Sequence, residues 1–369
     1  MKLGGVASIV GALVLGLAMS AASSARAYGY GSPLTSPCHE DMTGSALRRA
    51  RARWPGAAPL AATADDQLLF QSLVFDVPDD LRDIAAVGLL IGVRDHDTQG
   101  ESGIDTQELA RVHGEDDGQA LHCLRRSDED GAEGNARGAA ACREVIRSFV
   151  FEALDEGLAD DGTVGADLRS ELRVHLAFRG GTRVSLPTFY LRLGQALHTL
   201  QDAFSHTFRT PDQRRITVVL NWVEQVEGTL DEARDGPGHM RDLDLCGGLD
   251  AFRERRLATA REATDAIFEA VFDHGDDIEA KKRAVDAVLD TYMSYEPGCT
   301  LDNGWCDAPE VVYADGLCTC RLVGAGRRPG AAPIGPASGA GFALLVLATG
   351  VRRRRRARRR CAASGEVLR

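Results

Sequence analysis

Apolar residues recur at steps of three and four positions through residues 46–290, and this helical period restricts the fold more than any other feature of the chain. We find no convincing run of alternating polar and apolar residues, the pattern typical of strands. The sequence therefore predicts an all-α, multi-helix domain. The segments predicted to be helical are 142–158, 168–176, 187–206, 216–232, 249–273 and 278–295.

Two acidic, glycine-rich stretches lie between the predicted helices. Residues 95–118 and 127–138 contain few apolar side chains, so both are predicted to be long loops. Pro187 suits the first turn of the helix that it opens, because the N–H group missing from proline has no partner there in any case.

The N-terminus has the three parts of a secretory signal peptide. Lys2 precedes an apolar run at residues 6–19, and the small-residue sequence Ala25-Arg26-Ala27 forms a cleavage site. We expect residues 1–27 to be removed and the exported protein to begin at Tyr28.

The C-terminal part changes composition twice. Residues 296–326 form a predicted Cys-rich stalk that follows the predicted helical domain at 28–295. Residues 327–369 contain a Gly/Pro/Ala-rich spacer, an apolar run at 342–351 and an arginine-rich end, which stays on the cytoplasmic side of a membrane. With Cys318-Thr319-Cys320, this tail resembles the C-terminal sorting signal of myxobacterial surface proteins (the MYXO-CTERM type). An ordinary single-span anchor is the alternative, and both place the domain at the cell surface, in contact with the envelope membrane.

The net charge of −11 conceals an asymmetry between the ends and the middle of the chain. The ends, residues 1–27 and 321–369, together carry +13, so residues 28–320 carry −24. Such a field repels nucleic acid over about 8 Å at physiological salt, and it attracts divalent cations. We therefore expect no nucleic-acid partner.

Eight of the nine cysteines lie in the part predicted to be exported, where disulfides persist. Cys299 and Cys306 are close enough in sequence to close a small loop, and Cys123 and Cys142 could join neighbouring segments. The chain contains no CxxC pair, which argues against a structural zinc site built from cysteines.

The most informative segment contains His198, Asp202 and His206, spaced at i, i+4 and i+8. On a helix these side chains drift by only about 80° and can point into one cavity. Imidazole nitrogen and carboxylate oxygen are zinc ligands. The adjoining face carries the apolar residues that would hold the helix in the core: Leu193, Leu197, Leu200 and Phe204.

Residues 198–206 have the sequence His-Thr-Leu-Gln-Asp-Ala-Phe-Ser-His and follow the sequence Leu-Gly-x-Ala-Leu. This segment resembles the ligand helix of the zinc-dependent phospholipase C superfamily. That superfamily also includes single-strand nucleases and heterokaryon-incompatibility-type proteins, and the last branch is nearest. Two residues that the phospholipases and nucleases usually have between the Asp and the second His are missing here. The resemblance implies a mainly helical domain that holds as many as three Zn²⁺ ions and hydrolyses phosphodiesters.

The same resemblance implies further ligands in the order of the chain. The amine of a mature N-terminal Tyr28 and His39, eleven residues later, would complete one metal position. The other implied residues are His122, preceded by a carboxylate from Asp95 or Asp97, and His239 with Asp242. We expect His96, His113, His175 and His274 to have surface or loop roles.

The implied chemistry is metal-assisted attack of water on phosphorus. Asp202 would bridge two metals, and Asp95 or Asp97 would orient the water as a base. A phospholipid or another small phosphodiester is the expected substrate. The alternative is a non-catalytic surface module that retains a metal for stability or binds envelope lipid.

Overall fold

The computed structural model describes residues 37–247, 251–275 and 277–297. The predicted signal peptide, Tyr28, the C-terminal tail and all but the first two residues of the predicted stalk lie outside this part. The Cys299–Cys306 loop lies outside it as well. The α-helices are α2 (Cys38–Arg53), α3 (Ala64–Phe70), α4 (Ile84–Thr98), α5 (Thr106–Gly114), α6 (Asp116–Leu121), α7 (Gly131–Gly157), α8 (Thr188–Ser205), α9 (Val223–Glu227), α10 (Glu232–Asp235), α11 (Ala251–Phe272) and α12 (Ile278–Tyr292).

Helices form most of the described domain, and short 3-10 turns and two small sheets complete it. The 3-10 turns are η1 (Pro55–Ala57), η2 (Asp79–Leu81) and η3 (Arg241–Asp244). Each sheet is an antiparallel pair: β1 (Arg169–Leu176) with β2 (Gly180–Pro187), and β3 (Thr207–Arg209) with β4 (Ile216–Val219).

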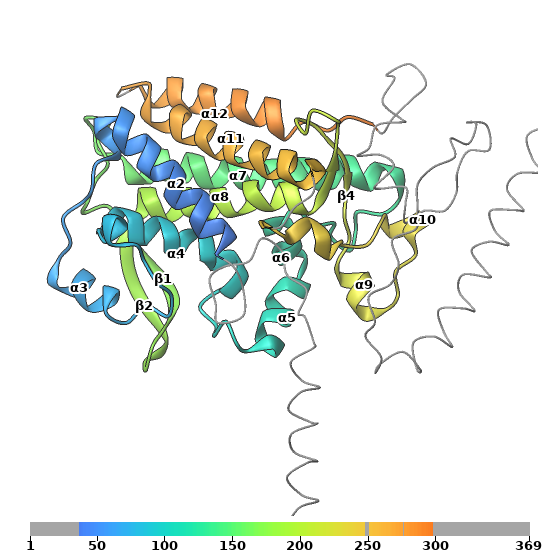
Figure 1. Ribbon diagram of the computed structural model, residues 1–369, viewed down its shortest axis with the longest axis horizontal. Coiled ribbons are helices and arrows are strands. Elements are labelled where there is room, and N and C mark those ends of the chain that lie inside the picture. The colour runs from blue at the N-terminus through green and yellow to red at the C-terminus, as the bar shows by residue number, and fades with distance from the viewer. Residues whose placement is uncertain (1–36, 248–250, 276, 298–369) are drawn as a thin grey trace, which may run out of the picture. The chain divides into compact units, whose positions relative to one another are not determined.

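Helix α8 lies at the centre of the core and packs against α4, α7, α11 and α2 (Figure 1). All of its residues except Arg192 are buried, polar ones included. Asp83 caps the N-terminus of helix α4, because its carboxylate accepts hydrogen bonds from the backbone N–H groups of Ala85 and Ala86. The predicted helix at 187–206 is thus confirmed, and it places its polar face inside the protein.

Two glycines let α4 and α8 touch through their backbones. A Cβ added at Gly92 would lie 2.2 Å from the carbonyl oxygen of Leu191, and one added at Gly194 would lie 2.2 Å from that of Leu89. Both contacts are far below van der Waals distance, so the crossing requires glycine at both positions. On each helix, this crossing lies about one turn before the polar residues of the C-terminal part.

The prediction of a helix at 168–176 is wrong, because this segment is β1. Leu172, Val174 and Leu176 alternate with Arg173 and His175, which is the two-residue period of a strand with one buried face. The same leucines also fit a four-residue step, and this made the short run ambiguous. The mostly helical character of the predicted domain is confirmed, and the β-hairpin is an addition that the prediction of an all-α fold lacked.

The prediction of one helix at 216–232 is also wrong, because the segment begins as β4 and only then forms α9. The two predicted loops are partly helical. Residues 95–118 contain the end of α4, all of α5 and the start of α6, and α7 begins inside 127–138 at Gly131. Asp105 caps α5 by accepting a hydrogen bond from the N–H group of Glu108, a local signal that low apolar content concealed.

No helix in the described ranges is both long enough and apolar enough to cross a membrane.

Two disulfides join distant segments. Cys123 is bonded to Cys142, as the sequence suggested, and Cys38 is bonded to Cys246, a pair that the spacing did not reveal.

Candidate metal centre

Asp202, on α8, lies at the centre of a buried group of histidines. Its Oδ2 atom is 2.7 Å from Nδ1 of His122 and 3.1 Å from Nε2 of His198, and its Oδ1 atom is 3.2 Å from Nε2 of His39. Nδ1 of His206 lies 3.7 Å from Oδ2. Three segments therefore bring imidazoles to one carboxylate: α2, the end of α6 and α8.

Three of the four histidines around Asp202 share one hydrogen-bonding arrangement. The Nδ1–H groups of His39, His198 and His206 donate to carbonyl oxygens, which belong to the Gln201 side chain, Val93 and His122 respectively. Each bond holds its ring so that Nε2 points towards a carboxylate. Metal-binding histidines in proteins show this same arrangement, in which the second nitrogen is held by an outer partner.

Asp97 is the member of the Asp95/Asp97 pair that faces this group. Its carboxylate lies 3.5 Å from Nε2 of His113 and 3.9 Å from Nδ1 of His198. Asp95 instead accepts a hydrogen bond from the side chain of Gln195, at 2.7 Å. The two carboxylates point apart because a helix rotates successive residues by about 100° each.

His113 joins the group through Asp97, although the sequence predicted a surface or loop role for it. Its Nδ1–H group donates to the carbonyl of Leu109 at 2.6 Å, so its Nε2 atom also has a free lone pair. Its ring stacks on His122, with the ring centroids 4.4 Å apart. The prediction for His96 is wrong as well, because this side chain is 2% exposed and bonded to Thr199.

A second group lies beside the first, at the end of α8. Nε2 of His206 is 3.8 Å from Oδ1 of Asp244, and Nε2 of His239 is 3.1 Å from the same oxygen. The acid here is Asp244, five residues after His239, which we did not predict. The side chain of Asp242 lies outside those that the structure describes.

Several polar atoms in both groups are buried without a hydrogen-bond partner among the described residues. They are Nε2 of His122 and His206, Oδ1 of Asp202, and Oδ2 of Asp97 and Asp244. An unsatisfied buried polar atom costs about 1–3 kcal/mol, so such a concentration calls for an explanation. Cations bound in the two groups would give such atoms partners.

Among the residues that the structure describes, four sets of three side chains offer ligand atoms within 4.8 Å of one another. Three of them overlap, through shared use of Asp97, His122 or His198, and a carboxylate can serve two neighbouring metals. The sets are His39 with Asp97 and His198, Asp97 with His113 and His122, His122 with His198 and Asp202, and His206 with His239 and Asp244. The buried groups can therefore hold metal ions.

Burial keeps two of the histidines neutral. It lowers the pKa of His122 to about 4 and that of His206 to about 3. A neutral imidazole is the form that binds a metal. These two side chains are therefore ready to bind at neutral pH.

His198 differs from them. Burial lowers its pKa, but Asp202 and Asp97 together outweigh burial and raise the pKa to about 9. Burial also raises the pKa of Asp244, to about 7, against the opposing effect of His239. Without a metal, protons therefore occupy positions in both groups that a cation would take.

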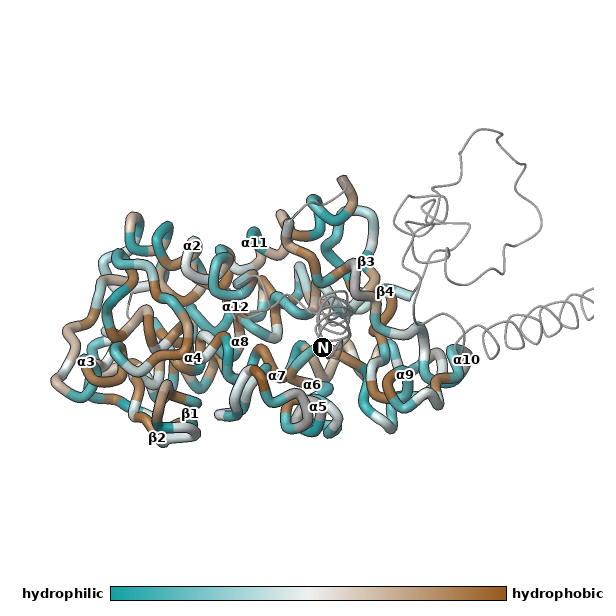
Figure 2. The backbone as a smooth tube through the Cα atoms, turned by 60° about the horizontal axis from the view of Figure 1, so that its bottom comes forward, coloured by the Kyte–Doolittle hydropathy of each residue, from teal (hydrophilic) through white to brown (hydrophobic). Residues whose placement is uncertain are grey.

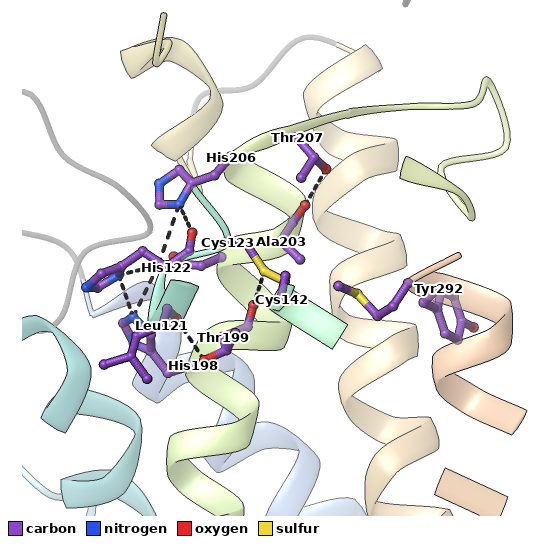
Figure 3. The surroundings of a disulfide bond; sticks show 12 residues. Leu121, His122, Cys123, Cys142, His198, Thr199, Ala203, His206, Thr207 and Tyr292 are labelled. Carbon is purple, nitrogen blue, oxygen red and sulfur yellow. Dashed lines mark hydrogen bonds and ion pairs between the residues drawn. A yellow bond between two sulfur atoms is a disulfide. The ribbon is translucent and has the colours of Figure 1, made fainter. Parts of the chain in front are cut away.

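Each disulfide is adjacent in sequence to a histidine of the centre. Cys38 precedes His39, and its partner Cys246 lies two residues after Asp244. Cys123 follows His122 and joins it to α7 through Cys142. Figure 3 shows the imidazoles of His122, His198 and His206 beside this second disulfide. The disulfides therefore restrain the segments that carry these ligand residues. Packing of the helices alone would not hold those segments in place.

Access to the centre is narrow. The side chains of His39, His198 and Asp202 are fully buried, whereas those of His113 and His239 are 23% and 9% exposed. Trp222 lies beside His113, with ring centroids 6.0 Å apart. A cavity of about 750 Å³ near Glu40 contains none of these histidines in its lining, so we do not assign it to the centre.

The fold and the site define a mostly helical, disulfide-bonded protein with buried His/Asp groups that can hold metal ions. No protein-family model matches the chain, and no curated protein or solved structure matches it significantly.

Proposed function

We propose that this protein is an exported zinc-dependent phosphodiester hydrolase that acts at the cell surface. The observation that carries the proposal is the row of imidazoles around Asp202, whose Nδ1–H groups are held by carbonyl oxygens so that their Nε2 atoms face carboxylates. An arrangement of this kind orients imidazole ligands for a metal.

Zinc suits the chemistry of the ligands. The groups offer imidazole nitrogen and carboxylate oxygen and no cysteine thiolate, because the cysteines next to His39 and His122 are in disulfides. Such mixed sets of His and carboxylate are typical of catalytic zinc sites. The residues that would hold the ions are those of the four sets, with the N-terminal amine of Tyr28 as a proposed addition.

The closeness of the sets supports the proposed hydrolysis of a phosphodiester. Metals bound about 3.5–4 Å apart lower the pKa of a bound water and neutralise the charge on phosphoryl oxygens. Asp202 lies between the His39 side and the His122 side of the group, as a bridging carboxylate must. We assign the proposed role of orienting a water to Asp97, because Asp95 is held by Gln195.

The substrate that fits best is small. The residues at the edge of the centre are His113 and His239, and the centre itself is closed. A charge of −24 on residues 28–320 disfavours long nucleic acids. A phospholipid head group or a comparable small phosphodiester is therefore the proposed substrate class.

The burial of the centre also favours the second candidate function, a non-catalytic surface module that uses metal for stability. A fully enclosed ligand set is typical of structural metal sites, whereas catalytic sites keep one position open.

Metal content and activity separate the two functions. The mature chain beginning at Tyr28 is loaded with zinc, its metal is counted by mass spectrometry, and hydrolysis of phosphatidylcholine and of a chromogenic phosphodiester is measured with and without chelator. Two or three ions per chain and chelator-sensitive hydrolysis support the enzyme. A zinc-loaded protein that hydrolyses neither substrate supports the module, and a protein that retains no zinc overturns both.

Export is tested separately. The two disulfides support it, because they persist mainly outside the cytosol. N-terminal sequencing of protein from isolated envelopes should give Tyr28 as the first residue. Protein found in the cytosol with residues 1–27 attached would contradict export.

A further inference from the structure

We propose that the β1–β2 hairpin inserts its tip into a phospholipid bilayer and so holds the protein at a lipid surface. The hairpin takes no part in the metal centre, and the proposal rests on the proposed function only in that lipid would be the substrate.

The tip residue, Phe178, is fully exposed. Its relative exposure is 109%, the largest among the exposed large hydrophobic residues of the described chain. A phenylalanine that contacts only water forgoes the free energy that burial of its ring would give. Insertion into a bilayer would recover it.

The backbone at Phe178 is also unfavourable. Its φ angle is 62°, in the left-handed region that β-carbons disfavour and that glycine or asparagine usually occupies in turns. Gly180, two residues later, has φ 65° and shows the ordinary choice for such a position. A bulky aromatic residue is thus present where both the backbone and the solvent disfavour it, and residues of this kind concentrate at functional sites.

Other exposed apolar side chains lie on segments that are bonded to this hairpin. The backbone N–H of Ala177 donates to the carbonyl of Ser72, and Arg173 pairs with Glu101. Five of the seven exposed large hydrophobic residues belong to the hairpin, to the stretch that leads into it or to these neighbouring segments: Leu68, Val74, Ile104, Leu168 and Phe178. The apolar exposure of the described chain is therefore concentrated around one projection.

The hairpin is basic, whereas residues 28–320 as a whole are acidic. Residues 169–187 contain four arginines and one glutamate, a charge of +3 within a region of −24. Arg179 is exposed next to Phe178, and Arg183 pairs with Glu171 at 3.4 Å between side chains that are 81% and 68% exposed. Exposed pairs of this kind are weak, so lipid phosphates can compete for Arg183, whereas Arg169 is held by the buried Asp66. An aromatic tip with arginines behind it matches the apolar interior and anionic surface of a bilayer.

The hairpin projects from the same side of the helical layer as α5, which carries His113 at the edge of the metal centre (Figure 1). Figure 2, viewed from a direction turned by 60°, also shows both elements along one edge. Helix α12 lies on the opposite side in Figure 1. Insertion of the tip would therefore bring the edge of the metal centre towards the lipid surface.

The test places a tryptophan at the tip of the full mature chain and measures whether lipid contacts it. The Phe178→Trp variant is mixed with vesicles of phosphatidylcholine and phosphatidylglycerol that carry bromine on their acyl chains. The parent chain, with its three tryptophans, gives the background. The matched control is Ala287→Trp, at an exposed position on α12.

We expect quenching and a blue shift for Phe178→Trp that exceed both the parent and Ala287→Trp. Equal quenching of the two variants in vesicle-bound protein, or no binding to vesicles, would overturn the proposal. Measurement after chelation separates this outcome from the proposed function, because insertion of the tip requires no metal, whereas hydrolysis does.

A second variant distinguishes a lipid-binding role from a structural one. Phe178→Gly should unfold at the same or a higher temperature, because glycine accepts the left-handed conformation, while its vesicle affinity falls about tenfold or more. Arg179→Gln should weaken binding to anionic vesicles by about fivefold. A lower unfolding temperature for Phe178→Gly with unchanged vesicle affinity would show that the tip serves the fold.

Discussion

The Nδ1 atom of His122 lies 2.7 Å from the Oδ2 atom of Asp202, although 80 residues separate them in the chain. This contact joins the end of α6 to the last turn of α8, where His198 and His39 also contact the same carboxylate. One aspartate thus holds imidazoles that come from three parts of the fold.

We expect Asp202→Asn to lose at least one metal ion per chain, because the neutral amide is a poor ligand and can no longer bridge. Metal counting by mass spectrometry after dialysis measures this. Asp95→Asn is the control, since Asp95 is a nearby carboxylate outside every candidate ligand set. Equal metal content in Asp202→Asn and the parent would refute the central role of Asp202.

Gln201→Leu should weaken metal binding by about 10–100-fold, the usual effect of removing an outer partner of a ligand histidine. Gln201 accepts the Nδ1–H of His39 and is itself held by Thr43 and Thr264, so its loss frees the ring to rotate. Competition with a chromogenic chelator measures the affinity. Gln195→Leu, which changes another buried glutamine of α8, should leave the affinity nearly unchanged.

Gly92→Ala and Gly194→Ala should each lower the free energy of unfolding by about 1–3 kcal/mol or more, because the added methyl groups meet backbone atoms that cannot move aside. Gly88→Ala, on the same helix, is the matched control. Its Cβ would lie 3.6 Å from Pro187, an ordinary contact, and alanine favours a helix over glycine. Thermal unfolding of the three variants tests the crossing, and equal stability of all three would contradict it.

Metal affinity should rise with pH up to about 9. The raised pKa of His198, about 9, means that the metal-free folded protein holds a proton there at neutral pH, and Asp244, with a pKa of about 7, holds part of another. Binding must displace them, so about one to two protons are released at pH 7. Calorimetry in buffers of different ionisation enthalpy counts them. Binding without proton release would show that the metal does not contact these groups.

The same groups set the stability of the metal-free protein. The contribution of His198 is fully present below its unfolded pKa of about 6.5 and is lost as the pH rises through about 9. His122 and His206 have the opposite effect, because their pKa values are lower in the folded state than in the unfolded state. As the pH falls, the unfolded state therefore binds protons at these residues before the folded state does. Stability should therefore fall as the pH drops from about 6.5 through 4, as acid titration followed by circular dichroism would show.

The sequence by itself determined α8 and its ligand face. Spacing at i, i+4 and i+8 places His198, Asp202 and His206 on one side of any helix, whatever surrounds it. Helices α11 and α12 were equally clear, because their apolar period is long and uninterrupted. Local sequence patterns were sufficient to predict an element wherever its structure depends on that segment alone.

Tertiary structure decided which other side chains meet that face. Asp97, and not Asp95, joins the centre because the contact of Gly92 with Gly194 sets how α4 turns against α8. His113, for which we expected a surface or loop role, joins it because α5 places its ring beside Asp97 and His122. The identification of Asp244 required the fold, in which the Cys38–Cys246 disulfide ties its segment to α2. The β1–β2 hairpin was not predicted for a related reason. The eight residues of β1 fit both the helical period and the strand period, and only pairing with β2 selects the strand. Contacts between segments far apart in the chain depend on packing, and no local period encodes them.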